Sequence, residues 1–298
     1  MLRRTLLLAF AKREPLASVY GQQLTEVVYI QSVALMGRLR LGSLADVERL
    51  AAPFVNGEKD SLAKLTPSHL SGHLLFDALH QKTRKPVYRE RVLAAAAKAE
   101  FSLYNEMSDG VFMGPPILAR AGKIDIAVDH FLQLQKLCLR TDGLWRHSPL
   151  CDAAWGRGNA FPLLGLALTL ESDPKNATLL PAYRQLAATL VRHQTPDGLW
   201  RQVVDHPTAY EEFSATAMIG AALRKGVRHR WLDRSTYQPV IDRAHKAVAA
   251  RTRANGEVID VCESTGKQTT LEAYLSRKAI RGIDPRGGGM ALYFATEP

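Results

Sequence analysis

A turn motif recurs along this chain at the spacing of a helical hairpin, and it constrains the fold more than any other feature. TDGLWRH begins at Thr141, PDGLWRQ at Pro196 and the looser ANGEVID at Ala254, and the three glycines are separated by 55 and then 58 residues. A repeat of this length is one supersecondary unit that buries its apolar face only against its neighbours. We therefore predict consecutive helical pairs joined by similar turns.

The segments between these turns have the apolar periodicity of helices. In residues 25–41, for example, Val28, Leu35 and Leu39 fall on one helical stripe. Strand patterns are scarce, and residues 256–262 form a candidate hairpin arm within a loop. About twelve helices in six hairpins predict a single all-α domain over residues 1–298, an (α/α)6 barrel with its joining loops gathered at one mouth.

Charge and composition narrow the function classes. A net charge of +10 favours an anionic partner, but no nucleic-acid-binding signature accompanies it. No apolar run approaches the roughly 18 residues of a membrane helix. The three cysteines are too widely spaced for a zinc motif or a disulfide framework, which fits a reducing compartment. The oligomeric state is left open.

The first fifteen residues, MLRRTLLLAFAKREP, allow two interpretations. We favour a helix of the fold, because the apolar run is short for a signal peptide and is followed at once by Lys12 and Arg13. We therefore expect a cytoplasmic protein. A cleaved signal would instead indicate the periplasm.

Few motifs carry chemistry. The chain lacks GxSxG, Walker and GxGxxG sequences, and RGGGM (286–290) is more typical of a flexible closing loop than of a phosphate cradle. His69 and His73 have the i, i+4 spacing of a zinc pair but lack the glutamate of HExxH, so core or cleft histidines are favoured and no metal is expected.

Asp109 is the most informative acidic residue. It precedes an apolar helical run, so Ser108 or Asp109 acting as a helix N-cap is one interpretation. In the other, desolvation by Met107, Phe112 and Met113 favours the protonated carboxyl, as a general acid requires.

Five segments in order resemble glycoside hydrolase family 105, the unsaturated rhamnogalacturonyl hydrolases, and more distantly family 88, the unsaturated glucuronyl hydrolases. They are SDGVFMGPPILARAG (108–122), WGRGNAFPLLGLA (155–167), QTPDGLWRQVVD (194–205), YEEFSATAMIGAALRKG (210–226) and VCESTG (261–266). The resemblance runs from about Val28 to the C-terminus. It implies an (α/α)6 barrel that needs no cofactor and releases a 4,5-unsaturated uronic acid from lyase-generated oligosaccharides. Hydration of the C4=C5 enol ether drives the release, and unsaturated galacturonyl-rhamnose from pectin is the implied substrate.

The resemblance also implies roles for individual residues. Asp109 matches the general acid and base, and His147 matches a histidine of the cleft. Arg157 and Asn159 match a segment that contacts sugar. Trp145 and Trp155 are candidates either for stacking on sugar rings or for burial at helix ends.

Departures from the family pattern keep an alternative open. Phe161 stands where relatives commonly have tryptophan, and no acidic residue occurs from Leu65 to Phe76, where many carry a second carboxylate. His69 or His73 is expected to fill that space. The chain is short for the family, so its first hairpin is expected to be trimmed. An inactive, carbohydrate-binding barrel is the alternative function, and a helical scaffold for protein partners is a third.

Overall fold

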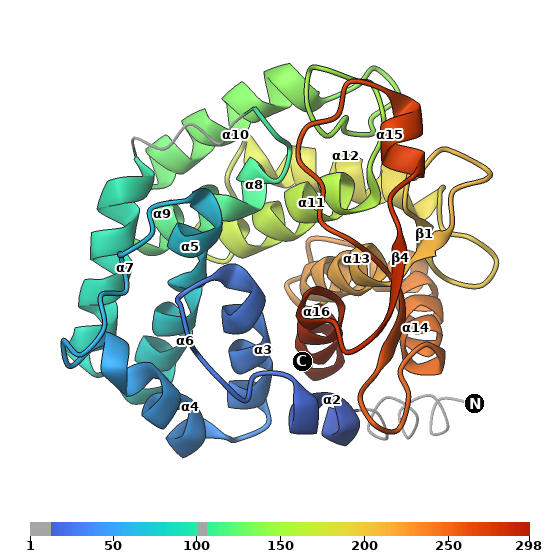
Figure 1. The fold of residues 1–298 in the computed structure, drawn as a ribbon. Helices are drawn as coiled ribbons and strands as arrows, with labels where there is room; N and C mark the ends of the chain where they lie inside the picture. Colours follow the sequence, from blue (N-terminus) through green and yellow to red (C-terminus); the bar gives the residue numbers. More distant parts are fainter. Residues whose placement is uncertain (1–12, 101–105) are drawn as a thin grey trace.

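The computed structural model describes residues 13–100 and 106–298, and the helices of this part of the chain form an inner and an outer ring (Figure 1). The last helix, α16 (Pro285–Thr296), packs against α3 (Tyr29–Arg40), so the inner ring closes on itself. The predicted all-α (α/α)6 barrel is confirmed. The two interpretations of the N-terminus fall largely on residues 1–12, outside the described residues.

The inner ring runs in order through α3, the pair α5 (Pro67–Gly72) and α6 (Leu74–Thr83), the pair α8 (Gly110–Met113) and α9 (Pro115–Arg120), α11 (Gly156–Leu170), α13 (Phe213–Arg228) and α16. The outer ring consists of α2 (Arg13–Val19), α4 (Leu44–Ala51), α7 (Pro86–Ala99), α10 (Ile124–Cys138), α12 (Leu179–Val191) and α14 (Arg234–Ala250). A short 3₁₀ helix, η1 (Ala52–Phe54), follows α4.

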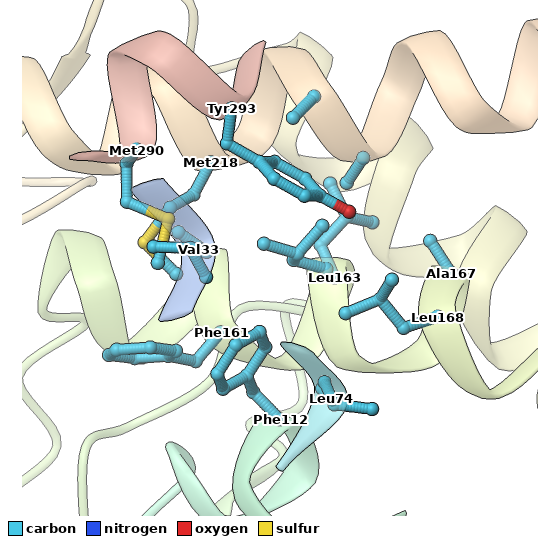
Figure 2. Packing of buried hydrophobic residues seen from close by; sticks show 14 of the residues in the cluster. Val33, Leu74, Phe112, Phe161, Leu163, Ala167, Leu168, Met218, Met290 and Tyr293 are labelled. Carbon is cyan, nitrogen blue, oxygen red and sulfur yellow. The ribbon is translucent and has the colours of Figure 1, made fainter. Parts of the chain in front are cut away.

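Apolar patterning assigns each helix to its ring. All fifteen residues of α11 are buried, as expected for a helix that is almost entirely apolar from Ala160 onward. In contrast, α10 buries one stripe, which includes Phe131 and Leu134, and exposes its other face. Inside the barrel, side chains from α8, α11, α13 and α16 converge, among them Phe112, Phe161, Met218 and Met290 (Figure 2).

The three repeated turns have the same hydrogen bonds. The peptide N–H of Arg140 donates to the carbonyl of Leu144, that of Thr195 to Leu199, and that of Arg253 to Glu257. The glycines at 143, 198 and 256 have φ of 87°, 91° and 83°, a region that L-residues with a side chain rarely adopt. Each turn follows an outer helix and leads toward an inner one. The repeat therefore brings three loops to one mouth of the barrel.

Each repeated turn also packs against the next outer helix. A Cβ on Gly143 would lie 2.6 Å from Thr189 Oγ1 of α12, and one on Gly198 would lie 2.7 Å from the carbonyl oxygen of Arg243 in α14. A Cβ on Gly256 would lie 2.5 Å from Val19 of α2. The turns thus link the outer helices to one another.

Two small antiparallel hairpins complete the mouth. Strand β1 (Trp200–Arg201) pairs with β2 (Glu211–Glu212), and β3 (Val258–Cys262) pairs with β4 (Ala279–Gly282). The arm predicted at 256–262 is confirmed by β3. The short helix α15 (Leu271–Leu275) lies in the loop between β3 and β4.

The prediction of a flexible loop at residues 286–290 is wrong, since these residues are part of α16. Its glycines allow close packing: a Cβ on Gly288 would lie 1.9 Å from the Tyr20 ring, and one on Gly287 would lie 2.3 Å from Val261. In the described part of the chain, no helix combines the length and apolar character needed to cross a bilayer.

Candidate active site

Asp109 is held at the mouth of the barrel by two close contacts of its neighbours. The peptide N–H of Ser108 donates to the carbonyl of His147 at 2.9 Å. Helix α8, which begins directly after Asp109, crosses α11 where Gly165 has no side chain. A Cβ on Gly165 would lie 2.3 Å from the carbonyl oxygen of Val111. The position of Asp109 therefore depends on glycine in the neighbouring helix.

Replacing Gly165 by Ala should lower the free energy of unfolding by about 1–3 kcal/mol, the usual cost of overpacking a rigid interior. The clash is with backbone, so it should outweigh the helix-propensity gain of about 1 kcal/mol. Urea unfolding measures the change. Gly266→Ala is the control, because a Cβ there has no neighbour within 4 Å. Equal stability of the two variants would contradict this account of the crossing.

The capping interpretation of Asp109 and Ser108 is wrong. The Asp109 side chain makes no cap hydrogen bond, and Ser108 Oγ is buried without a hydrogen-bond partner among the described residues. Asp109 Oδ1 instead lies 3.5 Å from Nε2 of His147, and neither atom makes a hydrogen bond within the described part of the chain. The carboxyl group remains about 17% exposed, while His147 is fully buried.

Two further side chains, Trp155 and Arg157, extend this arrangement in a row. The His147 ring lies 4.6 Å from the ring of Trp155, and the Arg157 guanidinium lies 4.7 Å from the same indole on a cation–π contact. The structure therefore brings together Asp109, His147, Trp155 and Arg157, four of the residues selected from the sequence. Whether they contact a sugar stays a prediction.

Arg157 is held by several acceptors. Its Nη1 donates to Ser214 Oγ at 3.1 Å and to the Cys262 carbonyl at 2.6 Å, and its Nη2 donates to the Glu263 carbonyl at 3.0 Å. Burial lowers the pKa of Arg157, but Coulomb attraction, most strongly to Glu212 at 3.9 Å, leaves that pKa raised overall. The guanidinium thus stays charged and fixes the β3 region beside α11.

Trp145 and Asn159 lie in the core instead of facing the mouth. Asn159 is fully buried, and its amide binds the peptide N–H and the carbonyl of Trp145, both at 2.8 Å. The Trp145 ring packs against Phe131. In the next repeat, Thr216 Oγ1 likewise accepts from the N–H of Trp200. These residues anchor the repeated turns, and neither Trp145 nor Asn159 presents a substantial exposed surface to a sugar.

His69 and His73 do not form a pair of free ligands. His69 Nδ1 lies 2.6 Å from Thr66 Oγ1, and its Nε2 lies 3.2 Å from a carboxylate oxygen of Glu26. His73 is fully buried, with Nδ1 3.1 Å from the His69 carbonyl and its ring against Phe76. Neither histidine takes the place of the second carboxylate in this geometry. Among the described residues, no three His, Cys, Asp or Glu side chains are grouped to hold a metal ion.

His73 should make stability depend on pH. Burial lowers the pKa of His73 to about 4, whereas an unfolded histidine titrates near 6.5. The unfolded state therefore binds more protons between these values, and stability falls as pH decreases from about 6.5 to about 4, by up to about 3 kcal/mol. Urea unfolding across this range should show a shallower fall for His73→Gln. Parallel curves for the two proteins would contradict the assignment.

Sequence reasoning missed three residues of this mouth. Tyr274 places its hydroxyl 2.9 Å from His147 Nδ1. Glu212 accepts hydrogen bonds from the peptide N–H groups that begin α13. Tyr29 packs edge-on against Phe112 and Phe161, and burial raises its pKa to about 12 against the opposing charge of Arg157. Of these three residues, only Glu212 lies in a segment that carries the family resemblance, YEEFSATAM. The sequence around Tyr274 has no motif that indicates a functional role.

The described residues form a large groove with a volume of about 1560 Å³, and Asp109 is not among the residues that line it. Its lining includes Arg184 and Arg230, together with Arg224 and Arg228 from the C-terminal end of α13. Ser214, at the other end of α13, binds Arg157, and fourteen residues of helix separate Ser214 from Arg228 by about 20 Å. Part of the positive charge is therefore gathered far from the candidate site.

The comparisons with known proteins agree with this architecture. The model of Glycosyl Hydrolase Family 88 matches residues 66–298. An unsaturated 3S-rhamnoglycuronyl hydrolase of Formosa agariphila is 36% identical over 110 residues, which cover 35% of this chain and 29% of that protein. An unsaturated rhamnogalacturonyl hydrolase of Bacillus subtilis is 27% identical over 147 residues, 48% of this chain and 40% of that protein. The matches thus span less than half of these curated relatives.

Solved structures share the fold over nearly the whole chain. A possible member of glycoside hydrolase family 105 from Klebsiella pneumoniae superposes with a TM-score of 0.82 at 21% identity, covering 100% of this chain and 93% of that one. An unsaturated glucuronyl hydrolase specific for heparin gives a TM-score of 0.75 at 16% identity, with 99% and 96% covered. At these identities the likeness establishes the fold.

Proposed function

Because the chain belongs to glycosyl hydrolase family 88, we propose that it hydrolyses oligosaccharides with a 4,5-unsaturated uronic acid at the non-reducing end. Residues 1–298 would form one catalytic domain. The observation that carries the proposal is the Asp109 carboxyl, which is partly exposed, makes no cap and faces Nε2 of buried His147 at 3.5 Å. Asp109 Oδ1 makes no hydrogen bond to the described residues, so it is available for proton transfer.

The reaction follows from the chemistry of an enol ether. Asp109 in its acid form donates a proton to C4, and a water molecule adds to C5 while the Asp109 carboxylate takes up the proton that this water loses. The product is a hemiketal at C5. Its ring opens to a ketone, and the resulting C1 hemiacetal releases the remaining oligosaccharide. The proton count closes, because Asp109 regains the proton that it gave.

The neighbouring residues support an anionic substrate. Arg157 supplies a fixed positive charge near a uronate carboxylate, and its stacking holds the Trp155 ring at the mouth. We base the substrate class on the similar proteins, which include an unsaturated rhamnogalacturonyl hydrolase of Bacillus subtilis. We propose unsaturated galacturonyl-rhamnose as the preferred disaccharide. Three unpaired cysteines support a cytoplasmic location.

An inactive carbohydrate-binding barrel is the alternative function, and the positions of His69 and His73 favour it. His73 is enclosed and His69 is paired with Glu26, so neither acts as a second acid in the observed geometry. The ultraviolet absorbance of the conjugated enol-ether carboxylate separates the two functions. On a panel of lyase-generated disaccharides, the hydrolase should remove this absorbance and release a saturated sugar. Binding without loss of absorbance on every member would favour the alternative.

A further inference from the structure

Tyr274 is held rigidly at the mouth although it lies far along the chain from His147. It sits on α15, whose first turn is capped by the Thr270 side chain, and it is fully buried. Its carbonyl accepts a hydrogen bond from Gln202 Nε2 at 2.8 Å. Gln202 occupies the same place in the second repeated turn as His147 does in the first. Two equivalent positions of the repeat therefore bind one tyrosine.

The hydrogen bonds of the Tyr274 hydroxyl determine where its proton lies. The peptide N–H of Gln268, which can only donate, points to this hydroxyl at 3.2 Å. The hydroxyl therefore accepts there, and its own proton is available to His147 Nδ1 at 2.9 Å. Burial raises the pKa of Tyr274, so the phenol keeps this proton. An imidazole that accepts at Nδ1 carries its proton on Nε2 when it is neutral.

We propose that Tyr274 is a positioning residue that fixes neutral His147 in the Nε2–H tautomer, so that this N–H is directed at the Asp109 carboxylate. The opposite tautomer would aim the Nε2 lone pair at Oδ1 across 3.5 Å, which is repulsive when Asp109 is ionised. Trp155 covers the His147 ring and Arg157 lies beyond that indole. The tautomer is a property of the resting protein, whereas its catalytic consequence rests on the proposed function.

The consequence is that the Nε2–H of His147 assists the carboxylate form of Asp109 in the cycle. The Nε2–H stabilises the carboxylate after the proton has moved to C4, and it orients that carboxylate toward water. His147 neither gains nor loses a proton in this scheme. Its effect should therefore appear in kcat more than in KM, because substrate binding does not require the tautomer.

Nitrogen-15 NMR of the histidine rings tests the tautomer directly in the whole protein at about pH 8, above the ordinary histidine pKa. The His147→Gln spectrum identifies the His147 signals. We expect a protonated Nε2 and an unprotonated Nδ1 in the wild-type protein. In Tyr274→Phe, this signature should be replaced by the Nδ1–H form or by a mixture. A wild-type His147 protonated at Nδ1 alone would overturn the proposal.

Kinetics on an unsaturated disaccharide provide the second readout. Tyr274→Phe should lower kcat roughly tenfold, the value of one buried hydrogen bond, with KM nearly unchanged. Tyr210→Phe removes a hydroxyl that binds the Lys278 carbonyl beside the same loop and is the matched control, with kcat expected unchanged. Unchanged tautomer and kcat in Tyr274→Phe would overturn the proposal. If the wild-type protein acts on no unsaturated substrate, the proposed function fails, and the NMR result still decides the tautomer.

Discussion

Asp109→Asn should lower the turnover of an unsaturated disaccharide by roughly 10²–10⁴-fold or more, the usual contribution of general acid–base catalysis. The amide has nearly the size of the carboxyl but cannot transfer the proton to C4. The fold should survive, because the Asp109 side chain makes no cap hydrogen bond and packs at a partly exposed position. Initial rates from the loss of enol-ether absorbance, together with a urea unfolding curve, separate catalysis from stability.

Asp125→Asn provides the matched control for this variant. It makes the same chemical change at an exposed position in the first turn of α10, away from the mouth. Its turnover should equal that of the wild-type protein. Near wild-type turnover in Asp109→Asn would place the acid elsewhere. Unfolding of Asp109→Asn with no separable catalytic effect would show that the carboxyl is structural after all.

Glu212→Ala should destabilise the protein by about 3–5 kcal/mol, the cost of removing one partner from a buried charged network. The Glu212 carboxylate accepts hydrogen bonds from the peptide N–H groups of Ser214 and Ala215, and from that of Cys262. It also lies 3.9 Å from Nη1 of Arg157. Its loss would leave three buried peptide N–H groups without this acceptor and a buried cation without its nearest carboxylate.

Urea unfolding measures this effect, with Glu90→Ala on the exposed surface of α7 as the control. The Glu90 change should alter stability by no more than about 0.5 kcal/mol. The loss of stability in Glu212→Gln should lie between those of Glu90→Ala and Glu212→Ala, because the amide oxygen of Gln can still accept part of these hydrogen bonds. A loss below about 1 kcal/mol for Glu212→Ala would contradict the network described here.

The repeated turns predicted the architecture because their glycines impose the same local geometry three times. Positive φ at Gly143, Gly198 and Gly256 favours one turn type, and six hairpins with apolar helices can bury their faces by closing into a ring. The same repeat left two interpretations of Trp145 open, sugar stacking and burial. A tryptophan in an aromatic loop suggests sugar stacking, but here the ring fills the core beneath the turn that its backbone anchors.

The candidate site was only partly predictable. Asp109, His147 and Arg157 each lie in a segment with a recognisable pattern, but Tyr274 contacts His147 across 127 positions of the chain. Nothing in the sequence near Tyr274 indicates that contact, since it arises when the loop between β3 and β4 folds over the mouth. The i, i+4 spacing of His69 and His73 favoured core or cleft histidines, but it does not indicate what their shared helix face packs against.

Reaction in deuterium oxide tests the hydration chemistry most directly. If the protein protonates C4 of the enol ether, the first keto acid released should carry a deuterium at C4, detected by mass spectrometry and NMR. Preformed keto acid kept in deuterium oxide corrects for exchange next to the ketone. The account predicts deuterium at C4 above that background, with the product formed roughly 10²–10⁴-fold more slowly by Asp109→Asn. Release of the uronate with its C4=C5 double bond intact, and no deuterium at C4, would contradict it.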